Sequence, residues 1–346
     1  MKKEFLIAGF AISSVVISQP ASAANFNQVF VFGDSLSDTG NIANATNFAF
    51  PPSPPPPQTS PYFQGRFSNG PLWVDYLSQQ LGLNPTLATS PNINTATEGI
   101  NFAFGGSTTG LNNAFAPTST LPGVLAQVNL FTQSLQTRNQ KADPNALYFV
   151  WGGGIDYLFG NTTDPTQVVG NLANAITSLT TAGAKNIGVF NLPDLGTLPF
   201  ITNNPNNPPQ LAAGLTALTN AHNVGLGNVT NALRSSTGAN IFTVDVNQLL
   251  ANISVNPQQF GFNNVTNACF LADFDQIRTG NFNLCNNAND FLSYDGVHPT
   301  TRGHNLIAQT ALNAVRANTI PEPSTVLGML ALALVGAGFG KKRVNG

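Results

Sequence analysis

Charged residues are scarce in this sequence, and so are histidine and cysteine. Only 8% of the 346 residues are charged, with 13 Lys and Arg against 15 Asp and Glu, which gives a formal net charge of −2. A mildly acidic chain with so little positive charge is not typical of nucleic-acid-binding proteins, so we expect no nucleic-acid partner. The three histidines and two cysteines do not show the spacing of metal ligands, so we expect no metal site.

The first residues have the pattern of a secretion signal. Lys2 and Lys3 precede an apolar run over residues 5–17, and Ala21-Ser22-Ala23 supplies small residues of the kind that signal peptidases recognise. We therefore expect residues 1–23 to be removed on export from the cytoplasm. The alternative is a buried N-terminal strand or helix.

The last residues, 319–346, form a second candidate processing signal. Pro321-Glu322-Pro323 precedes an uncharged apolar stretch over residues 325–340, and the basic Lys341-Lys342-Arg343 follows. The stretch is near the short limit of roughly 17–25 residues for crossing a membrane, and the basic residues would stay cytoplasmic. This arrangement resembles the PEP-CTERM sorting signal. The resemblance implies a membrane-bound tail, an exosortase-type processing enzyme as partner, and a final place in the cell envelope, at the cell surface or outside the cell. A plain C-terminal anchor is the alternative.

Both cysteines, Cys269 and Cys285, would reach the oxidising compartment that a secretion signal implies. We therefore expect a disulfide rather than two free thiols. A bridge closing a loop of about 15 residues stabilises by roughly 3 kcal/mol in the chain-entropy model.

The remaining residues, 24–318, have the pattern of one α/β domain with a parallel sheet. Short apolar runs that end near glycine alternate with longer amphipathic stretches. Five strands are expected at residues 28–32, 100–104, 146–151, 186–190 and 241–244. Five helices are expected at residues 72–81, 124–135, 166–181, 211–233 and 300–315. The proline-rich residues 51–61 predict an extended surface loop, and residues 256–292 predict an irregular excursion held by the disulfide.

Ser35 is the candidate nucleophile. It follows the first predicted strand directly, so it lies at the carboxyl edge of the sheet, where open α/β sheets bind ligands. A helix that begins there would present free N–H groups and a positive dipole end to an oxyanion. The surrounding residues do not match the G-x-S-x-G elbow of α/β-hydrolases. A serine at this place can equally be a helix N-cap.

A candidate base lies near the other end of the chain, in Tyr294-Asp295-Gly296-Val297-His298. An aspartate three residues before a histidine can orient the imidazole through one ring N–H, leaving the other nitrogen to take a proton from a serine. An unaided serine hydroxyl is a poor nucleophile and requires such a partner. His222 lies midway along a predicted helix, which indicates a structural or solvated residue. His304 is expected to be a packing residue of the last helix.

Four ordered blocks resemble those of the GDSL, or SGNH, hydrolase family, in its lipase- and esterase-like branch. The blocks are Gly33-Asp34-Ser35-Leu36-Ser37-Asp38-Thr39-Gly40-Asn41, Gly65-Arg66-Phe67-Ser68-Asn69-Gly70 continuing into Trp73-Val74-Asp75-Tyr76-Leu77, Gly99-Ile100-Asn101-Phe102-Ala103-Phe104-Gly105-Gly106, and Asp295-Gly296-Val297-His298-Pro299-Thr300. The resemblance implies a three-layer α/β/α sandwich of flavodoxin-like topology, ester hydrolysis and no cofactor. It also implies an oxyanion hole formed by the N–H groups of Ser35 and Gly106.

One position departs from the family pattern. Where the family's third block ends a strand with Gly-x-Asn-Asp, this chain has Gly153-Gly154-Ile155-Asp156, so Ile155 replaces an asparagine that donates to the oxyanion. Losing such a donor typically costs on the order of 10²–10³ in kcat. Three interpretations stay open: a weakened enzyme, a substitute donor such as Asn161 or a water molecule, or a lapsed activity. We expect Asp156 to hydrogen-bond nearby loops.

The sequence therefore predicts an exported serine hydrolase that cleaves small-molecule, lipid or acylated-sugar esters through Ser35, His298 and Asp295. Two alternatives remain at this point. One is a catalytically impaired surface or matrix protein that keeps the fold, which Ile155 favours. The other is a carbohydrate O-deacetylase, because the same chemistry cleaves acetylated sugars.

Overall fold

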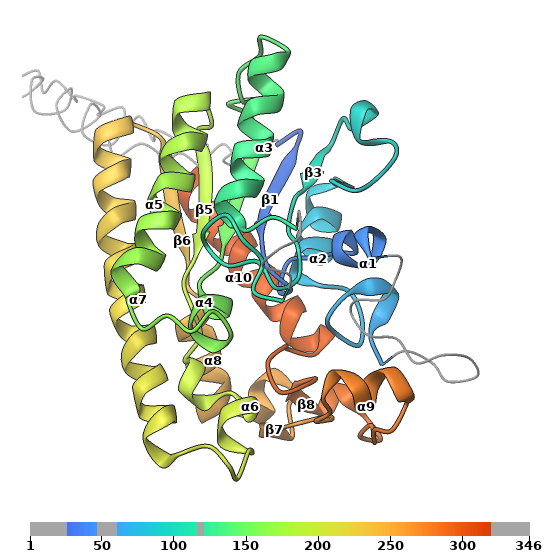
Figure 1. The fold of residues 1–346 in the computed structure, drawn as a ribbon. Coiled ribbons are helices and arrows are strands. Elements are labelled where there is room, and N and C mark those ends of the chain that lie inside the picture. The colour runs from blue at the N-terminus through green and yellow to red at the C-terminus, as the bar shows by residue number, and fades with distance from the viewer. Residues whose placement is uncertain (1–25, 47–60, 116–120, 320–346) are drawn as a thin grey trace, which may run out of the picture. The chain divides into compact units, whose positions relative to one another are not determined.

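The computed structural model describes residues 26–46, 61–115 and 121–319, and a parallel sheet forms its centre (Figure 1). The strand order is β2-β3-β1-β4-β5-β6. The strands are β1 (Val29–Gly33), β2 (Thr86–Leu87), β3 (Gly99–Asn101), β4 (Leu147–Trp151), β5 (Asn186–Phe190) and β6 (Asn240–Val244). Apart from β2, this is the 2-1-3-4-5 order of flavodoxin-like folds.

The α/β class and the parallel sheet are confirmed, but the prediction of five strands is one too few. The additional strand β2 is only two residues long and half-buried, so no apolar run announces it. It pairs with β3 at the sheet edge, with Thr86 opposite Ile100. The predicted strand at residues 100–104 is also shorter in the structure, because β3 ends at Asn101.

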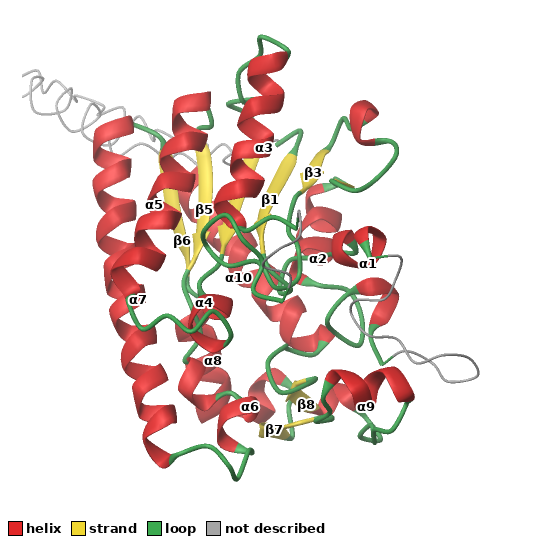
Figure 2. Cartoon of the chain, in the orientation of Figure 1, coloured by secondary structure: helices red, strands yellow, loops and turns green. Residues whose placement is uncertain are grey.

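The described residues contain ten α-helices, and Figure 2 shows the longer ones beside the main sheet and α6 and α9 near the small β7-β8 pair. They are α1 (Asn41–Ala45), α2 (Trp73–Leu81), α3 (Val124–Thr137), α4 (Gly154–Leu158), α5 (Pro165–Ala182), α6 (Pro199–Thr202), α7 (Pro209–Thr237), α8 (Val246–Val255), α9 (Phe274–Thr279) and α10 (Thr301–Thr319). Helices α3, α5 and α7 pack on one face of the sheet, and α2 and α10 pack on the other. The result is the expected three-layer sandwich.

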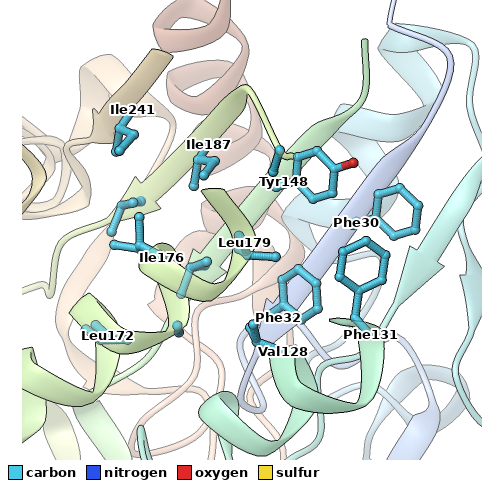
Figure 3. Packing of buried hydrophobic residues seen from close by; sticks show 14 of the residues in the cluster. Phe30, Phe32, Val128, Phe131, Tyr148, Leu172, Ile176, Leu179, Ile187 and Ile241 are labelled. Atoms are coloured by element: carbon cyan, nitrogen blue, oxygen red, sulfur yellow. The ribbon is translucent and has the colours of Figure 1, made fainter. Parts of the chain in front are cut away.

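Alternate residues of each central strand face opposite helical layers. Phe30 and Phe32 of β1 point to the layer of α3 and α5, where Phe30 stacks on Tyr148 with ring centroids 5.2 Å apart (Figure 3). Val29 and Val31 join the opposite core with α2 and α10. Both faces of the sheet are therefore dry, which explains why β1 and β4 are continuous apolar runs, buried at every position.

The core on the α2 side is built around large aromatic rings. Trp151 stacks on Phe190 with centroids 4.5 Å apart, and Trp73 contacts the same phenylalanine at 4.5 Å. The Trp73 indole N–H donates to Ser37 Oγ at 3.1 Å. This hydrogen bond ties the turn that follows β1 to helix α2.

The segment at residues 256–292 is more regular than the sequence predicts. It holds β7 (Asn264–Ala268), the helix α9 and most of β8 (Phe291–Ser293), and the two strands form a small parallel sheet. Neither strand shows an apolar run, because β7 is polar and half-exposed and β8 has three residues. Cys269 and Cys285 are joined by a disulfide inside this segment.

Three predicted features fall on residues that the structure does not describe. The predicted signal peptide at residues 1–23 and the apolar tail at residues 325–340 lie outside the described residues, and so does the proline-rich loop at residues 51–61 except for Pro61. Within the described ranges, every helix is too short or too polar to span a bilayer.

The position of the disulfide leads to a prediction about local stability. The backbone N–H groups of Cys269 and Phe270 donate to Ser293 and Tyr294, just before Asp295, so the bridged loop supports that strand from one side. In a Cys269→Ala/Cys285→Ala variant, we expect amide hydrogen exchange over residues 264–295 to accelerate by about tenfold or more, while β1 and β4 stay protected. Exchange measured by mass spectrometry tests this. Equal exchange in the variant and the wild type would show that the bridge does not support β8.

Candidate active site

Three neighbouring strands deliver three of the predicted site residues to one edge of the sheet, while Asp295 and His298 lie between β8 and α10. Ser35 follows β1, Gly106 follows β3 and Ile155 follows β4, and β3, β1 and β4 are adjacent in the sheet. The connection after β1 runs toward β2 and β3, and the connection after the adjacent strand β4 runs the opposite way, toward β5. The ends of β1 and β4 therefore form the topological switch point at which open α/β sheets form their ligand sites. The turn after β1 is tight: a side chain at Gly33 would meet the Trp151 carbonyl at 2.9 Å.

The structure brings Ser35, His298 and Asp295 into one chain of hydrogen bonds. His298 Nε2 lies 2.8 Å from Ser35 Oγ, and His298 Nδ1 lies 2.7 Å from Asp295 Oδ2. With the Nδ1 tautomer that Asp295 favours, Nε2 is free to accept the serine proton. Ser35 and His298, which are 263 positions apart in the sequence, are thus in hydrogen-bond contact, as a serine nucleophile and its base must be.

The carboxylate of Asp295 has three further donors besides the His298 ring. Its Oδ1 accepts the backbone N–H groups of Val297 and His298, each at 2.8 Å, and its Oδ2 accepts the Tyr62 hydroxyl at 2.8 Å. Burial alone would raise the pKa of Asp295. The charge of His298 and the hydrogen bonds from His298 and Val297 outweigh burial and hold the pKa below its usual value. Asp295 therefore stays ionised at neutral pH and provides a negative charge beside the imidazole.

Phe67 stacks on one face of the imidazole, with ring centroids 5.1 Å apart and the two planes 29° from parallel. This stacking restricts rotation of the ring that Asp295 already orients. The other two histidines are buried elsewhere. His222 Nδ1 lies 3.1 Å from the Tyr157 hydroxyl, and burial lowers the pKa of His222 to about 4 and that of His304 to about 3. Both therefore stay neutral and structural.

Two backbone N–H groups are available where an oxyanion would form. Ser35 is 4% exposed, and Gly106 is also buried. Within the described residues, neither backbone N–H donates a hydrogen bond to the protein. Gly106 has a φ of 80°, and a side chain there would meet Asn113 Oδ1 and Phe115 at 2.7 Å, so only glycine fits this close turn.

A buried carboxylate holds this glycine turn in place. Asp38 accepts the backbone N–H groups of Gly40, Asn41 and Ile42, and its Oδ2 also accepts that of Gly105 at 2.8 Å. Burial raises the pKa of Asp38 to about 6 despite these donors. The same site holds Asp34, whose pKa burial also raises to about 6. The loop that contains Gly106 is thus fixed to the loop that contains Ser35.

Ile155 lies in the first turn of α4 and is 5% exposed. In the described chain it belongs to none of the hydrophobic core clusters, and it lines the same two cavities as Ser35. The neighbouring Asp156 accepts the Thr109 hydroxyl at 2.8 Å and the Thr109 N–H at 2.9 Å, so it ties α4 to the loop after Gly106. Asn161 is exposed and lines neither cavity.

Two cavities meet at Ser35. The larger has a volume of about 670 Å³, and the smaller has about 270 Å³. Ser35, Ile155 and Val297 line both of them, whereas His298, Asp295 and Gly106 line only the smaller one. In the ranges that the structure describes, no group of three His, Cys, Asp or Glu side chains is placed to hold a metal ion.

Sequence reasoning missed three residues of this site. Tyr62 comes just after the proline-rich stretch and carries no motif that would mark it. Phe67 and Asp38 do lie inside blocks that resemble the hydrolase family, and the polar spacing of Asp38 before Gly40 and Asn41 is typical of a turn-capping carboxylate. Their contacts to His298 and Gly105 depend on the tertiary fold and have no local signal.

Comparison with known proteins places this chain near lipases, esterases and acyltransferases. The family described as GDSL-like Lipase/Acylhydrolase matches residues 29–311. A phosphatidylcholine-sterol acyltransferase of Aeromonas hydrophila is 31% identical over 78% of this chain and 72% of its own length. An esterase of Pseudomonas aeruginosa is 30% identical over 90% of this chain, but this chain spans only half of that protein. A solved carbohydrate acetylesterase from Sinorhizobium meliloti aligns with 83% of this chain and 96% of its own, with 14% identity and a TM-score of 0.42.

A second match lies at the end of the chain. Residues 319–343 match the PEP-CTERM protein-sorting motif. This motif implies export to the cell envelope or the cell surface.

Proposed function

Because the chain belongs to the GDSL-like lipase/acylhydrolase family, we propose that it is an exported carboxylic-ester hydrolase with Ser35 as nucleophile, His298 as general base and Asp295 as the residue that orients His298. The observation that supports these roles best is the continuous hydrogen-bond chain from Ser35 Oγ through the His298 ring to Asp295, with distances of 2.8 and 2.7 Å. In this series of hydrogen bonds the serine hydroxyl faces a basic ring nitrogen, and the carboxylate binds the other ring nitrogen. This arrangement fits removal of the serine proton.

In the proposed reaction, Ser35 Oγ forms a bond to the acyl carbon while its proton moves to His298 Nε2. The tetrahedral intermediate collapses when the bond to the alcohol oxygen breaks, and His298 gives its proton to that oxygen. A water molecule, deprotonated by His298, then attacks the acyl-enzyme and releases the acid and free Ser35. Asp295 stays ionised throughout and stabilises the imidazolium that forms twice in the cycle.

The N–H groups of Ser35 and Gly106 are the proposed donors to the oxyanion. Their burial keeps water from competing for these donors, which strengthens each hydrogen bond in the transition state. Ile155 offers no donor from its side chain. Two backbone donors suffice for catalysis, and a third donor would stabilise the transition state further and raise kcat.

The ends of the chain define the proposed route of export. Residues 1–23 would be removed as a signal peptide, residues 24–318 would fold as the hydrolase domain, and the tail at residues 319–346 would be held in the membrane and processed by an exosortase-type enzyme. The PEP-CTERM match at residues 319–343 supports the last step.

Removal of the proposed nucleophile and base tests the function. We expect Ser35→Ala, His298→Ala and the double variant each to lower kcat on p-nitrophenyl butyrate by about 10⁴-fold or more, to nearly the same residual rate. The reason is that members of such a unit act together, so the second loss adds little to the first.

The matched control is Ser236→Ala at the exposed end of α7, which should keep the wild-type rate. Circular dichroism of all four proteins shows whether they fold alike. A double variant far slower than either single variant would contradict a shared mechanism, and a fully active Ser35→Ala would contradict the proposed function.

Tyr62 gives a prediction that separates positioning from general stability. In Tyr62→Phe, Asp295 loses one donor, so more of its charge faces the imidazole and favours the protonated ring. We expect kcat to fall a few-fold and the acid limb of the kcat/KM pH profile to move to higher pH. Tyr76→Phe, whose hydroxyl lies 2.8 Å from Thr301 Oγ1 outside the catalytic chain, is the control. An unmoved acid limb in Tyr62→Phe would assign Tyr62 a purely structural role.

Ile155 gives the prediction about rate enhancement. Its replacement by asparagine places an amide donor beside Ser35, so we expect Ile155→Asn to raise kcat by at least about tenfold, with little change in KM. Ile155→Leu keeps the volume without a donor and should keep the wild-type kcat. Both kcat and the melting temperature should be measured. A variant that is less stable and no faster would mean that the amide is buried without a partner, which contradicts the proposed place of residue 155.

A further inference from the structure

The two cavities that meet at Ser35 differ in size, in lining and in their relation to His298. The larger one lies among the loop at residues 191–198, α6, α8 and the β7-β8 sheet, elements that Figure 1 shows together at the lower end of the molecule. Its walls include Leu192, Leu195, Leu198, Val246, Leu250 and Val265. Ser35 and Leu36 lie at one side of this cavity, so an acyl group bonded to Ser35 has direct access to it.

Three of the polar side chains that line the larger cavity are hydrogen-bonded to other protein groups. Asp194 Oδ1 accepts the Gly196 N–H at 2.9 Å and the Thr216 hydroxyl at 2.7 Å. Asn247 Nδ2 donates to the Leu192 carbonyl at 3.0 Å. These groups hold the walls together and do not require a polar ligand. The cavity volume is within the range of about 300–1,000 Å³ that is usual for small-molecule sites.

The smaller cavity is lined by aromatic rings. Phe159 contacts Phe115 with ring centroids 5.1 Å apart and Phe200 with centroids 5.4 Å apart, and all three line the cavity together with Phe67. Leu271, which is half-exposed, lines it as well. This side of the site is therefore suited to a flat or apolar group.

The position of His298 decides which part of an ester lies on which side. The leaving alcohol oxygen must receive its proton from His298 Nε2, and His298 lines only the smaller cavity. The alcohol part of the ester must therefore lie on that side. The acyl part, bonded to the same carbon, then extends past Ser35 toward the larger cavity.

We propose that the substrate is an ester of a medium- or long-chain fatty acid, whose acyl chain fills the larger cavity while its alcohol part leaves through the aromatic cavity. Ile155 and Val297, which line both cavities beside Ser35, separate the two parts. This inference rests on the proposed function and adds the substrate class. An acetyl group would leave the larger cavity filled only with water, and a sugar would meet a mostly apolar wall, so acetylated sugars fit less well.

Chain-length selectivity tests the assignment. We expect wild-type kcat/KM for p-nitrophenyl octanoate to exceed that for the acetate by about tenfold or more, because each methylene in an apolar pocket favours binding of the transition state. Leu250→Trp on α8 and Val265→Trp on β7 narrow the larger cavity, and each should reduce this octanoate-to-acetate ratio by about tenfold. Gln248→Trp, exposed on α8 and lining neither cavity, is the matched control and should keep the wild-type ratio.

Leu271→Trp narrows the smaller, aromatic cavity. It should lower the ratio of 2-naphthyl octanoate to methyl octanoate hydrolysis and keep the octanoate-to-acetate ratio. If Leu271→Trp and not Leu250→Trp shortens the preferred acyl chain, the assignment of the two cavities is overturned. A wild-type octanoate-to-acetate ratio near one overturns the substrate class, although acetate hydrolysis would still support the proposed function.

A direct measurement does not depend on the variants folding. Reaction of the wild-type protein with p-nitrophenyl octylphosphonate forms a bond between Ser35 Oγ and phosphorus and releases p-nitrophenolate. A crystal structure of this adduct should place the octyl chain between α8 and β7. An octyl chain among the phenylalanines of the smaller cavity would overturn the proposal. No adduct and no turnover of any ester would show that the proposed function itself had failed, and the substrate class with it.

Discussion

The burial of the Asp295 carboxylate among four donors is the interaction on which the candidate site depends. An ionised carboxylate that is removed from water is costly unless it is fully hydrogen-bonded, and here the His298 ring, two backbone N–H groups and the Tyr62 hydroxyl supply the bonds. This carboxylate fixes the orientation of the imidazole, and the oriented imidazole is hydrogen-bonded to Ser35 Oγ. The disulfide-bonded segment meets the strand that ends next to Asp295, so part of the fold serves to fix this one group.

The sequence predicted best where a signal is local. Apolar runs marked β1, β4 and β5 within one or two residues, and the Asp-x-x-His spacing marked Asp295 and the His298 that contacts Ser35. The sequence predicted poorly those strands that form only because they pair with a neighbouring strand. The two-residue β2 and the polar β7 have no periodicity, and Tyr62 meets Asp295 across 233 positions. Such contacts depend on the packed fold, which a window of sequence does not contain.

Ile155 connects the departure from the family pattern with the shape of the site. The same side chain that offers the oxyanion no donor lines both cavities with Val297, between an apolar chamber and an aromatic one. An asparagine at this position would add a donor but would also place a polar group in an apolar partition. In the proposed account, an apolar wall between the two parts of the ester takes the place of one hydrogen bond, and the Ser35 and Gly106 N–H groups are the proposed donors to the oxyanion.

The central claim is that His298, held by Asp295, activates Ser35, and covalent labelling tests it without assuming a substrate. The purified domain would be treated with a fluorophosphonate, which reacts with activated serines, and the adduct located by peptide mass spectrometry. The account predicts one adduct, on Ser35, and a labelling rate that falls by about 10³-fold or more in His298→Ala. An adduct on a different serine, or an equal rate in the two proteins, would contradict it.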